Sequence, residues 1–302
     1  MWYQSRLNRP AITFAIPFYS GLAYLERTLE SVLAQTDSRW AAIVCDDGTE
    51  AGVEDVVARV GGGRIEYRRN ERNLGIGGNF TRCIDVAETP LVTVLHADDE
   101  LAPSYGAVMI SAADRHPTAA ALFCHAMIIG PQGQPWFSLA DRMKRYLDPS
   151  WKRELVLYGE PGVRALLRAN FIMAPTLCFR KSVLGARRFD DRHKFVIDWM
   201  LTMQILVDGD QLVGVPDVCY RYRRHDNNAT ETLTKTQTRF REESEFYDQM
   251  REVCAARGWD DCVAIATDKR FVKLNVTYRA LKSLALLDLA EARRGFRLLR
   301  EL

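Results

Sequence analysis

Short apolar runs alternate with stretches of helical spacing along the first 130 residues, and this alternation constrains the fold more than any other feature of the chain. The apolar runs cover residues 11–17, 40–45, 65–68, 91–95 and 119–129. Between them, apolar residues recur every three or four positions, which is typical of an amphipathic helix. Repeated strand–helix units favour a mostly parallel sheet flanked by helices on both faces. The sequence therefore predicts an α/β fold.

The second part of the chain is less regular. Residues 136–160 resemble an exposed insertion, helices are predicted near 162–169 and 196–207, and short strands near 176–179 and 212–215. From about residue 232 onward Gly and Pro are rare, which indicates further helices. We therefore expect two parts, an α/β domain over residues 1–230 and a helical C-terminal extension over residues 231–302.

Composition excludes several classes of protein. The 302 residues are 47% hydrophobic and 26% charged, as in an ordinary globular chain. A net charge of +2 gives no reason to expect a nucleic-acid partner. The N-terminus lacks an apolar core of leader length, and the longest nearly apolar segment, 119–130, is shorter than the roughly 20 residues that span a bilayer. We therefore expect a cytoplasmic protein without a transmembrane helix.

Two acidic clusters stand at the ends of predicted strands. "CDDGTE" carries Asp46 and Asp47, whereas "HADDEL" carries Asp98, Asp99 and Glu100. Parallel strands present their carboxyl ends at one edge of the sheet, where ligands bind. Adjacent carboxylates repel each other unless a cation, a hydrogen-bond donor or water satisfies them. Together the clusters suit a ligand with hydrogen-bond donors at one end and a metal-bound diphosphate at the other, although each cluster alone is also a turn signal.

Seven segments follow one another over roughly residues 11–230. They read "TFAIPFYSGLAYLERTLESVLAQT", "WAAIVCDDGT", "NERNLGIGGNF", "PLVTVLHADDELAP", "NFIMAPTLCFRKSV", "RRFDDRHKFVIDWMLTMQIL" and "VCYRYRRHDNNAT". In order and spacing they resemble glycosyltransferase family 2, the inverting nucleotide-sugar enzymes of GT-A fold. The resemblance implies a Rossmann-like GT-A catalytic domain, with a nucleotide-sugar half at about 1–130 and an acceptor half at about 131–230. It also implies sugar transfer from a nucleotide-sugar donor, a UDP-sugar first, to an acceptor hydroxyl.

The resemblance places the nucleoside at the ends of the first two strands. It assigns the base contact to Asp46, with Asp47 as the alternative, and sets Pro17 and Tyr19 beside the base. A carboxylate there would accept hydrogen bonds from a base imide or from ribose hydroxyls. The Asn- and Gly-rich stretch at 73–79 fits no phosphate-loop spacing, so we expect it to shape a turn beside the nucleotide.

The segment "HADD" resembles the DxD-type metal motif of the family. Asp98 matches its last acid and is expected to bind Mg²⁺ or Mn²⁺, with His225 as a second metal ligand. His96 stands where the family usually has Asp, yet a neutral imidazole can still hydrogen-bond a ribose hydroxyl or bind a metal. Asp99 is expected either to brace the metal ligand or to approach the sugar, and Glu100 to be solvated.

Asp198 in "VIDWM" matches the catalytic acid pair of the family, although Ile197 stands where a Glu is usual. An inverting transfer needs a base on the acceptor side, opposite the departing diphosphate. An apolar neighbour favours burial, which would raise the pKa of Asp198 toward that of a useful base. The alternative role is capping of the helix that begins there, and the two roles are compatible.

The cluster "YRYRRH" at residues 220–225 offers guanidiniums and an imidazole to a diphosphate. The resemblance places the matching Arg and His near the leaving group, so we expect Arg223 and His225 to bind the donor there. Strand alternation would send Arg221 and Arg223 to one face.

Two other functions stay open at this level: a nucleotide-sugar-binding protein without turnover, suggested by His96 and Ile197, and a nucleotidyltransferase of similar fold. The acceptor is open among a glycan, a lipid-linked molecule and a small molecule. Basic residues lie among apolar ones in the C-terminal helices. They form either a solvated helix face or a peripheral contact with the inner face of the membrane.

Overall fold

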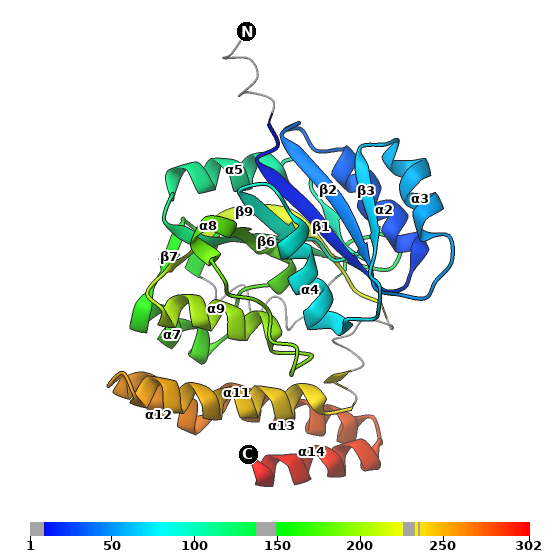
Figure 1. The fold of residues 1–302 in the computed structure, drawn as a ribbon. Helices are drawn as coiled ribbons and strands as arrows, with labels where there is room; N and C mark the ends of the chain where they lie inside the picture. The colour runs from blue at the N-terminus through cyan, green and yellow to red at the C-terminus, as the bar shows by residue number, and fades with distance from the viewer. Residues whose placement is uncertain (1–8, 137–148, 226–232, 235) are drawn as a thin grey trace.

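Four of the predicted strands form the parallel half of one sheet (Figure 1). The computed structural model describes residues 9–136, 149–225, 233–234 and 236–302. β1 (Ile12–Phe18) lies between β2 (Trp40–Asp46) and β4 (Leu91–Val94), with β3 (Ile65–Arg69) beyond β2, and all three pairings are parallel. Nearly every residue of β1, β2 and β4 is buried, because helices cover both faces of the sheet.

The other half of the sheet mixes strand directions. β6 (Ala119–Ile129) and β9 (Gln211–Arg223) pair in parallel along most of their length. β8 (Cys178–Arg180) runs antiparallel between β4 and β6, and β5 (Glu100–Leu101) and β7 (Leu155–Leu157) run antiparallel to β9. These three strands are only two or three residues long. The predicted mostly parallel sheet is therefore confirmed, in the order β3-β2-β1-β4-β8-β6-β9-β5.

Helices pack on the two faces of the sheet and bury two apolar cores. One core is shared with α2 (Leu22–Leu33), α3 (Val53–Gly61) and α5 (Tyr105–Arg115). The other is shared with α4 (Gly75–Val86), α7 (Gly159–Arg168), α8 (Lys181–Leu184) and α9 (Ile197–Val207). α9 is apolar on nearly all sides, because it lies between the sheet and the C-terminal helices.

The C-terminal extension is helical, as predicted, and forms a further layer against α7 and α9 (Figure 1). It consists of α11 (Thr238–Ala255), α12 (Asp260–Asp268), α13 (Arg270–Ala285) and α14 (Leu289–Glu301). The ring of Trp199 in α9 stacks on Phe246 of α11 with centroids 4.2 Å apart. The extension thus shares a core with the α/β domain. The boundary drawn near residue 230, and residues 137–148 of the insertion drawn at 136–160, lie outside the described residues. Residues 155–157 of that insertion form β7 and pair with β9, so this part is not a separate exposed insertion.

Two predicted boundaries are wrong. β9 continues to Arg223, well past the predicted end at residue 215, and α4 begins at Gly75 inside the stretch predicted as a turn. Glycine is a poor helix former, so periodicity does not reveal this first turn. Gly77 is needed for packing, because a Cβ there would lie 3.1 Å from the carbonyl oxygen of Asp190 and from the Cα of Asp191. Gly77 therefore lets α4 approach the loop that leads to α9.

Candidate active site

Asp46 ends β2 and is fully buried. Its carboxylate accepts hydrogen bonds from the N–H of Gly48 at 2.9 Å, the hydroxyl of Tyr67 at 2.8 Å and the guanidinium of Arg69 at 2.7 Å. Tyr67 and Arg69 both come from β3, which pairs with β2, so the neighbouring strand compensates the buried charge. Asp46 therefore holds the turn after β2. Its contact with a base stays a prediction.

Asp47 connects the end of β2 to the start of α4. Its carboxylate accepts hydrogen bonds from the side-chain amide of Asn70 at 2.9 Å and from the backbone N–H groups of Leu74 at 2.8 Å and Gly75 at 3.0 Å. A negative charge is favourable at a helix N-terminus, where backbone N–H groups lack partners within the helix. Asp47 thus positions α4, and a donor contact through it also stays a prediction.

The ends of β1 and β2 approach each other closely. A Cβ added to Gly48 would lie 1.9 Å from the carbonyl oxygen of Tyr19, so only glycine allows this approach. Pro17 is the second-to-last residue of β1, opposite Cys45 in β2. The side chain of Tyr19 just beyond is 62% exposed. The backbone of Tyr19 thus lies against the turn after β2, and its exposed side chain is open to solvent, where the predicted base would stack.

The second acidic cluster converges behind β4. His96, Asp98 and Asp99 each offer one ligand atom, and these atoms all lie within 4.8 Å of one another. A tight turn brings them together, because the N–H of Asp99 donates to the carbonyl of His96 at 3.1 Å. Carboxylate oxygens are the ligands that Mg²⁺ and Mn²⁺ prefer, and the imidazole adds a nitrogen. The donor set therefore fits a divalent cation.

Asp99 is the fully buried member of this cluster. Its carboxylate accepts hydrogen bonds from the backbone N–H of Arg223 at 2.7 Å and from the hydroxyl of Tyr220 at 2.9 Å. Burial raises the pKa of Asp99 well above its ordinary range, and the neighbouring charge of Asp98 raises it further. Because the Asp99 carboxylate is not exposed to solvent, it cannot contact a sugar bound in the site. Of the two roles left open by the sequence, the geometry supports bracing.

Asp98 and His225, the two predicted metal ligands, are neighbours in the structure. The Nε2 atom of His225 lies 2.9 Å from the Oδ2 atom of Asp98, and the imidazole stacks on the ring of Tyr24 with centroids 4.7 Å apart. Burial lowers the pKa of His96, which favours the neutral imidazole that a metal or a ribose hydroxyl requires. Metal binding by these residues stays a prediction that the geometry permits.

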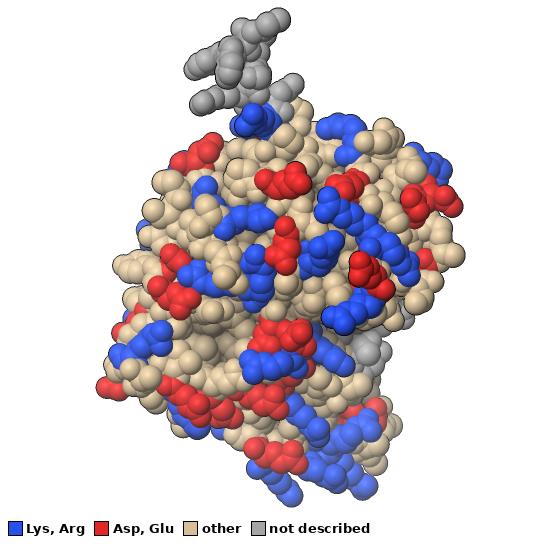
Figure 2. Space-filling view, in the orientation of Figure 1, with Lys and Arg blue, Asp and Glu red and all other residues tan. Residues whose placement is uncertain are grey.

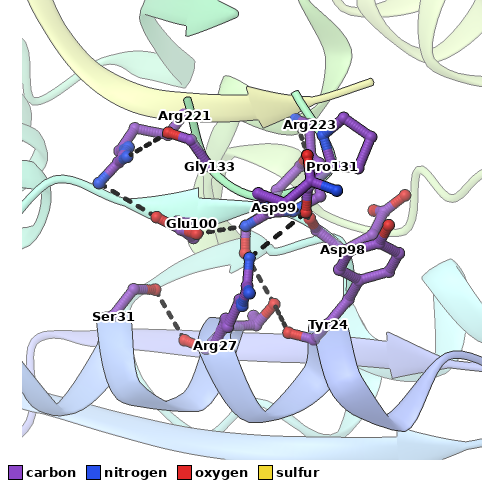
Figure 3. Close-up of polar contacts among 12 residues, drawn as sticks. Tyr24, Arg27, Ser31, Asp98, Asp99, Glu100, Pro131, Gly133, Arg221 and Arg223 are labelled. Carbon is purple, nitrogen blue, oxygen red and sulfur yellow. Dashed lines mark hydrogen bonds and ion pairs between the residues drawn. The ribbon is translucent and has the colours of Figure 1, made fainter. Parts of the chain in front are cut away.

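Arg223 lies behind the acidic turn, with its side chain fully buried (Figure 3). Its guanidinium donates to the carbonyl of Asp98 at 2.8 Å and to the carbonyls of Gly130 and Pro131 at 3.1 and 3.0 Å. It also forms an ion pair with Glu100. These contacts direct the guanidinium into the protein, so the structure supports a positioning role for Arg223. The side chain has no exposed surface through which it could make the predicted contact with a leaving group.

Glu100 is not solvated, and that prediction is wrong. Its carboxylate pairs with Arg223 and, at 3.1 Å, with Arg221 (Figure 3). Both arginines lie on one face of β9, as alternation predicted. The antiparallel pairing of β5 with β9 places Glu100 opposite Arg221. Glu100, which the sequence places beyond the end of a strand, thus pairs with two arginines of β9.

Arg223→Met is expected to destabilise the protein by about 3–5 kcal/mol, because it leaves Glu100 and three carbonyl groups without their buried donor. Arg221→Met is the matched control, since its side chain is 40% exposed and it binds the same carboxylate. It should cost about 1 kcal/mol or less. Urea unfolding of the two variants measures the difference. Equal losses of unfolding free energy would contradict the bracing role.

A cavity of about 260 Å³ lies between the acidic turn and the start of α9. His96 and Phe80 line it on the side of the sheet, and Asp198, in the first turn of α9, lines it on the other. Tyr222 of β9 and Arg224, which follows the end of this strand, also face the cavity, on the side opposite to Arg221 and Arg223. The predicted base and the predicted metal turn therefore border one cavity.

The start of α9 is held by a residue of the C-terminal extension. The carboxylate of Glu242 in α11 accepts hydrogen bonds from the backbone N–H groups of Lys194 at 3.0 Å, Phe195 at 2.7 Å and Val196 at 3.4 Å. Val196 is the N-cap residue of α9, and no side chain within the helix caps it. The alternative that Asp198 is the N-cap of α9 is therefore wrong, because Asp198 lies within the first turn, and Glu242 holds the segment that leads into the helix.

Sequence reasoning missed the part of the cavity wall that the extension supplies. Arg239 and Glu243 of α11, which pair at 3.0 Å, line the cavity together with Phe271 of α13. These residues stand in ordinary helical sequence, without a motif that marks a site. Arg224 could have been predicted to line the cavity, because it follows Arg223 in the same extended segment and successive side chains of such a segment point to opposite sides.

Comparison with known proteins places this geometry in a family. Residues 13–181, more than half of the chain, match the family model of glycosyl transferase family 2. The succinoglycan biosynthesis protein ExoO of Rhizobium meliloti is 24% identical over 229 residues, which cover 74% of this chain and 64% of that protein. The protein MT1568 of Mycobacterium tuberculosis is 26% identical over 209 residues, covering 65% and 63%. The chain spans less than two thirds of the length of these curated relatives.

Solved structures show the same fold at low identity. S. aureus TarS 1–349 in complex with UDP-GlcNAc superposes with a TM-score of 0.66 at 16% identity, covering 90% of this chain and 75% of that one. The mannosyltransferase PcManGT of Pyrobaculum calidifontis, in complex with GDP-Man and Mn²⁺, superposes with a TM-score of 0.60 at 14% identity, covering 97% and 83%. The predicted GT-A fold is confirmed. The chain belongs to glycosyl transferase family 2, a family of enzymes that transfer sugars.

Proposed function

We propose that this protein transfers a sugar, with inversion, from a nucleotide-sugar donor to an acceptor hydroxyl, with a divalent cation at the acidic turn. One observation carries the proposal: His96 of the acidic turn and Asp198 of α9 line the same cavity. A donor held at the turn and an acceptor held near Asp198 would therefore meet there. Family membership supports sugar transfer as the reaction class.

The donor side is proposed at the joined ends of β1, β2 and β4. The exposed Tyr19 ring offers a stacking surface for a base, and the buried carboxylates of Asp46 and Asp47 hold the turn after β2 that would receive the base. UDP-sugars are our first candidates, with GDP- and dTDP-sugars open. The two structural neighbours were solved with UDP-GlcNAc and with GDP-Man, so the fold accommodates more than one nucleotide.

Asp98 would hold Mg²⁺ or Mn²⁺, with His225 and His96 as the adjacent nitrogen ligands. When bound, such a cation neutralises the diphosphate leaving group. Asp99 and Arg223 contribute without touching the donor. Asp99 holds the N–H of Arg223, and Arg223 holds the carbonyl of Asp98, so the turn keeps one conformation. A preorganised turn loses less free energy on binding than a mobile one.

Asp198 would act as the general base. The acceptor oxygen forms a bond to the anomeric carbon while the bond from that carbon to the diphosphate oxygen breaks, and the hydroxyl proton passes to the Asp198 carboxylate. Attack from the face opposite the leaving group inverts the anomeric configuration, so an α-linked donor gives a β-linked product. Glu242 fixes the start of α9 and thereby the position of Asp198.

The acceptor side contains two buried polar atoms that need partners. The indole Nε1 of Trp199 and the amide Oδ1 of Asn170 have no hydrogen-bond partner among the residues that the structure describes, and both residues line the cavity. A buried polar group without a partner is costly. Hydroxyl groups can accept from the indole N–H and donate to the amide oxygen. The cavity therefore suits an acceptor rich in hydroxyl groups, as part of a glycan, a lipid-linked molecule or a small molecule.

A panel of UDP-, dTDP-, GDP- and CMP-sugars tests the proposal in the presence and absence of Mn²⁺. A donor at about 100 times its Kd should stabilise the fold by about 2.7 kcal/mol, or roughly 5 °C in Tm. Release of the nucleotide diphosphate on addition of an acceptor would show turnover. Stabilisation without any release would favour a nucleotide-sugar-binding protein. Formation of a nucleoside triphosphate and a sugar phosphate on addition of inorganic pyrophosphate would favour a nucleotidyltransferase.

A further inference from the structure

α13 exposes an apolar stripe on the side that faces away from the protein. Val272, Val276 and Ala280 are buried in the core, whereas Leu274, Tyr278 and Leu281 are exposed by 63%, 59% and 52%. The spacing of the exposed residues, i, i+4 and i+7, places them on one face. A helix that is apolar on two sides is expected to have apolar contacts on both. The described residues of the protein cover only the inner side of α13.

The turn between α13 and α14 extends this stripe. Leu286, Leu287 and Leu289 are exposed by 70%, 83% and 52%. Leu287 has φ +62°, a left-handed conformation that is rare for a bulky side chain. Aspartate, asparagine or glycine would suit such a turn in water. Strained backbone and exposed leucines at one tip indicate a surface that contacts something apolar.

Exposed cations lie on the same two helices as the apolar surface. Lys282, Arg293, Arg297 and Arg300 are exposed and have no carboxylate partner among the described residues. Figure 2 shows basic side chains gathered at the lower end of the molecule, where Figure 1 places α13 and α14. Residues 279–302 contain six Lys or Arg and three Asp or Glu. Exposed leucines and cations on one helical pair match the chemistry of a bilayer surface that carries anionic headgroups.

α14 uses its own apolar face within the protein. Ala292, Gly295 and Leu298 are buried, and a Cβ at Gly295 would lie 2.9 Å from the Cβ of Ala280. This close approach locks α14 against α13. To cover the outward stripe of α13, α14 would have to move and lose its close contact with Ala280. The stripe stays open beside a rigid helical pair.

We infer that the α13–α14 end of the protein docks on the surface of a bilayer that contains anionic lipids. The leucines of the tip and the α13 stripe enter the apolar boundary, while the guanidinium and ammonium groups meet the lipid phosphates. The contact is interfacial, because none of the described helices is long and apolar enough to cross a membrane. Charge complementarity and the exposed leucines argue for lipid rather than for a second copy of this basic surface, which would repel itself.

Docking in this way would orient the active site. Phe271, in the first turn of α13, lines the cavity that contains Asp198, and Leu274 of the exposed stripe lies three residues further on. The cavity and the docking surface thus share one helix. Resting on the function proposed above, this geometry favours an acceptor that is linked to a lipid. The docking itself does not depend on that function.

Vesicle sedimentation of the whole chain tests the docking without a donor or acceptor. The protein should sediment with vesicles of phosphatidylcholine and phosphatidylglycerol, and far less with phosphatidylcholine alone or at high salt. Leu286→Ser/Leu287→Gly should lower the partition coefficient about tenfold or more. Glycine at 287 suits the positive φ, so this variant should fold. Arg293→Gln/Arg297→Gln should cause a similar loss, since each cation near the surface contributes about fivefold.

Tyr158→Ser and Lys152→Gln/Arg153→Gln are the matched controls, because these exposed residues lie outside the α13–α14 pair. They should sediment like the wild type. No sedimentation with anionic vesicles, or sedimentation that neither α13–α14 variant weakens, would overturn the inference. A dimer in light scattering that the leucine variant dissociates, without vesicle binding, would do so too and would assign the surface to self-association. Loss of transfer activity alone would not bear on it.

Discussion

Asp198→Asn is expected to lower kcat for sugar transfer by about 10³-fold, while the Kd of the donor stays within about twofold. The amide keeps the size and hydrogen-bonding capacity of the side chain but cannot accept the proton of an acceptor hydroxyl. The proposed donor site is at the other wall of the cavity, so donor affinity should change little. Transfer with the stabilising donor gives kcat, and thermal shift gives donor binding.

Asp55→Asn is the matched control for this variant. Asp55 stands in the first turn of α3, as Asp198 stands in the first turn of α9, and it is exposed far from the cavity. It measures what the loss of one charge at a helix N-terminus costs. Activity of Asp198→Asn within tenfold of the wild type would sink the assignment of the base. A matching loss in Asp55→Asn would show that stability, not proton transfer, had changed.

Asp98→Ala is expected to weaken metal-dependent donor binding by about 100-fold or more, because it removes the more exposed carboxylate of the proposed metal site. The stabilisation by donor plus Mn²⁺ should vanish, and the thermal stability without donor should change little. Thermal shift with and without Mn²⁺, together with the Mn²⁺ affinity of the free protein, provides the measurement.

Asp261→Ala is its control, because Asp261 pairs with Arg164 on the surface just as Asp98 pairs with His225 at the turn. It should respond to donor and Mn²⁺ as the wild type does. If Asp98→Ala also kept the full Mn²⁺-dependent gain, the acidic turn would not be the metal site. A donor that binds equally well without Mn²⁺ would lead to the same conclusion.

Much of the donor side could be predicted from sequence, because it depends on local order. An apolar strand followed by acidic residues places those residues at the carboxyl edge of a parallel sheet, and β2 and β4 lie on either side of β1 as this requires. His96, Asp98 and Asp99 therefore converge as the motif predicted. The errors at the start of α4 and the end of β9 arise where glycines hide a helix and where charged residues continue a strand.

Roles within these motifs could not be predicted in the same way. The sequence left Glu100 to solvent and Arg223 to the ligand, and it kept bracing as only one of two roles for Asp99, yet Arg223 binds both carboxylates behind the turn. Their separation along the chain exceeds 120 residues, so no local pattern links them. Only the pairing of β5 with β9 brings them together.

The sequence by itself determined the sheet, the acidic edge and the helix that carries Asp198, since each depends on residues close together in the chain. The tertiary structure alone decided which carboxylates face the cavity and which are buried and hold other residues in place. It also decided that Glu242 holds the start of α9 and that Phe271 completes the cavity. The physical reason is that a buried charge or cavity wall is defined by its partners, and here those partners come from distant segments packed on one core.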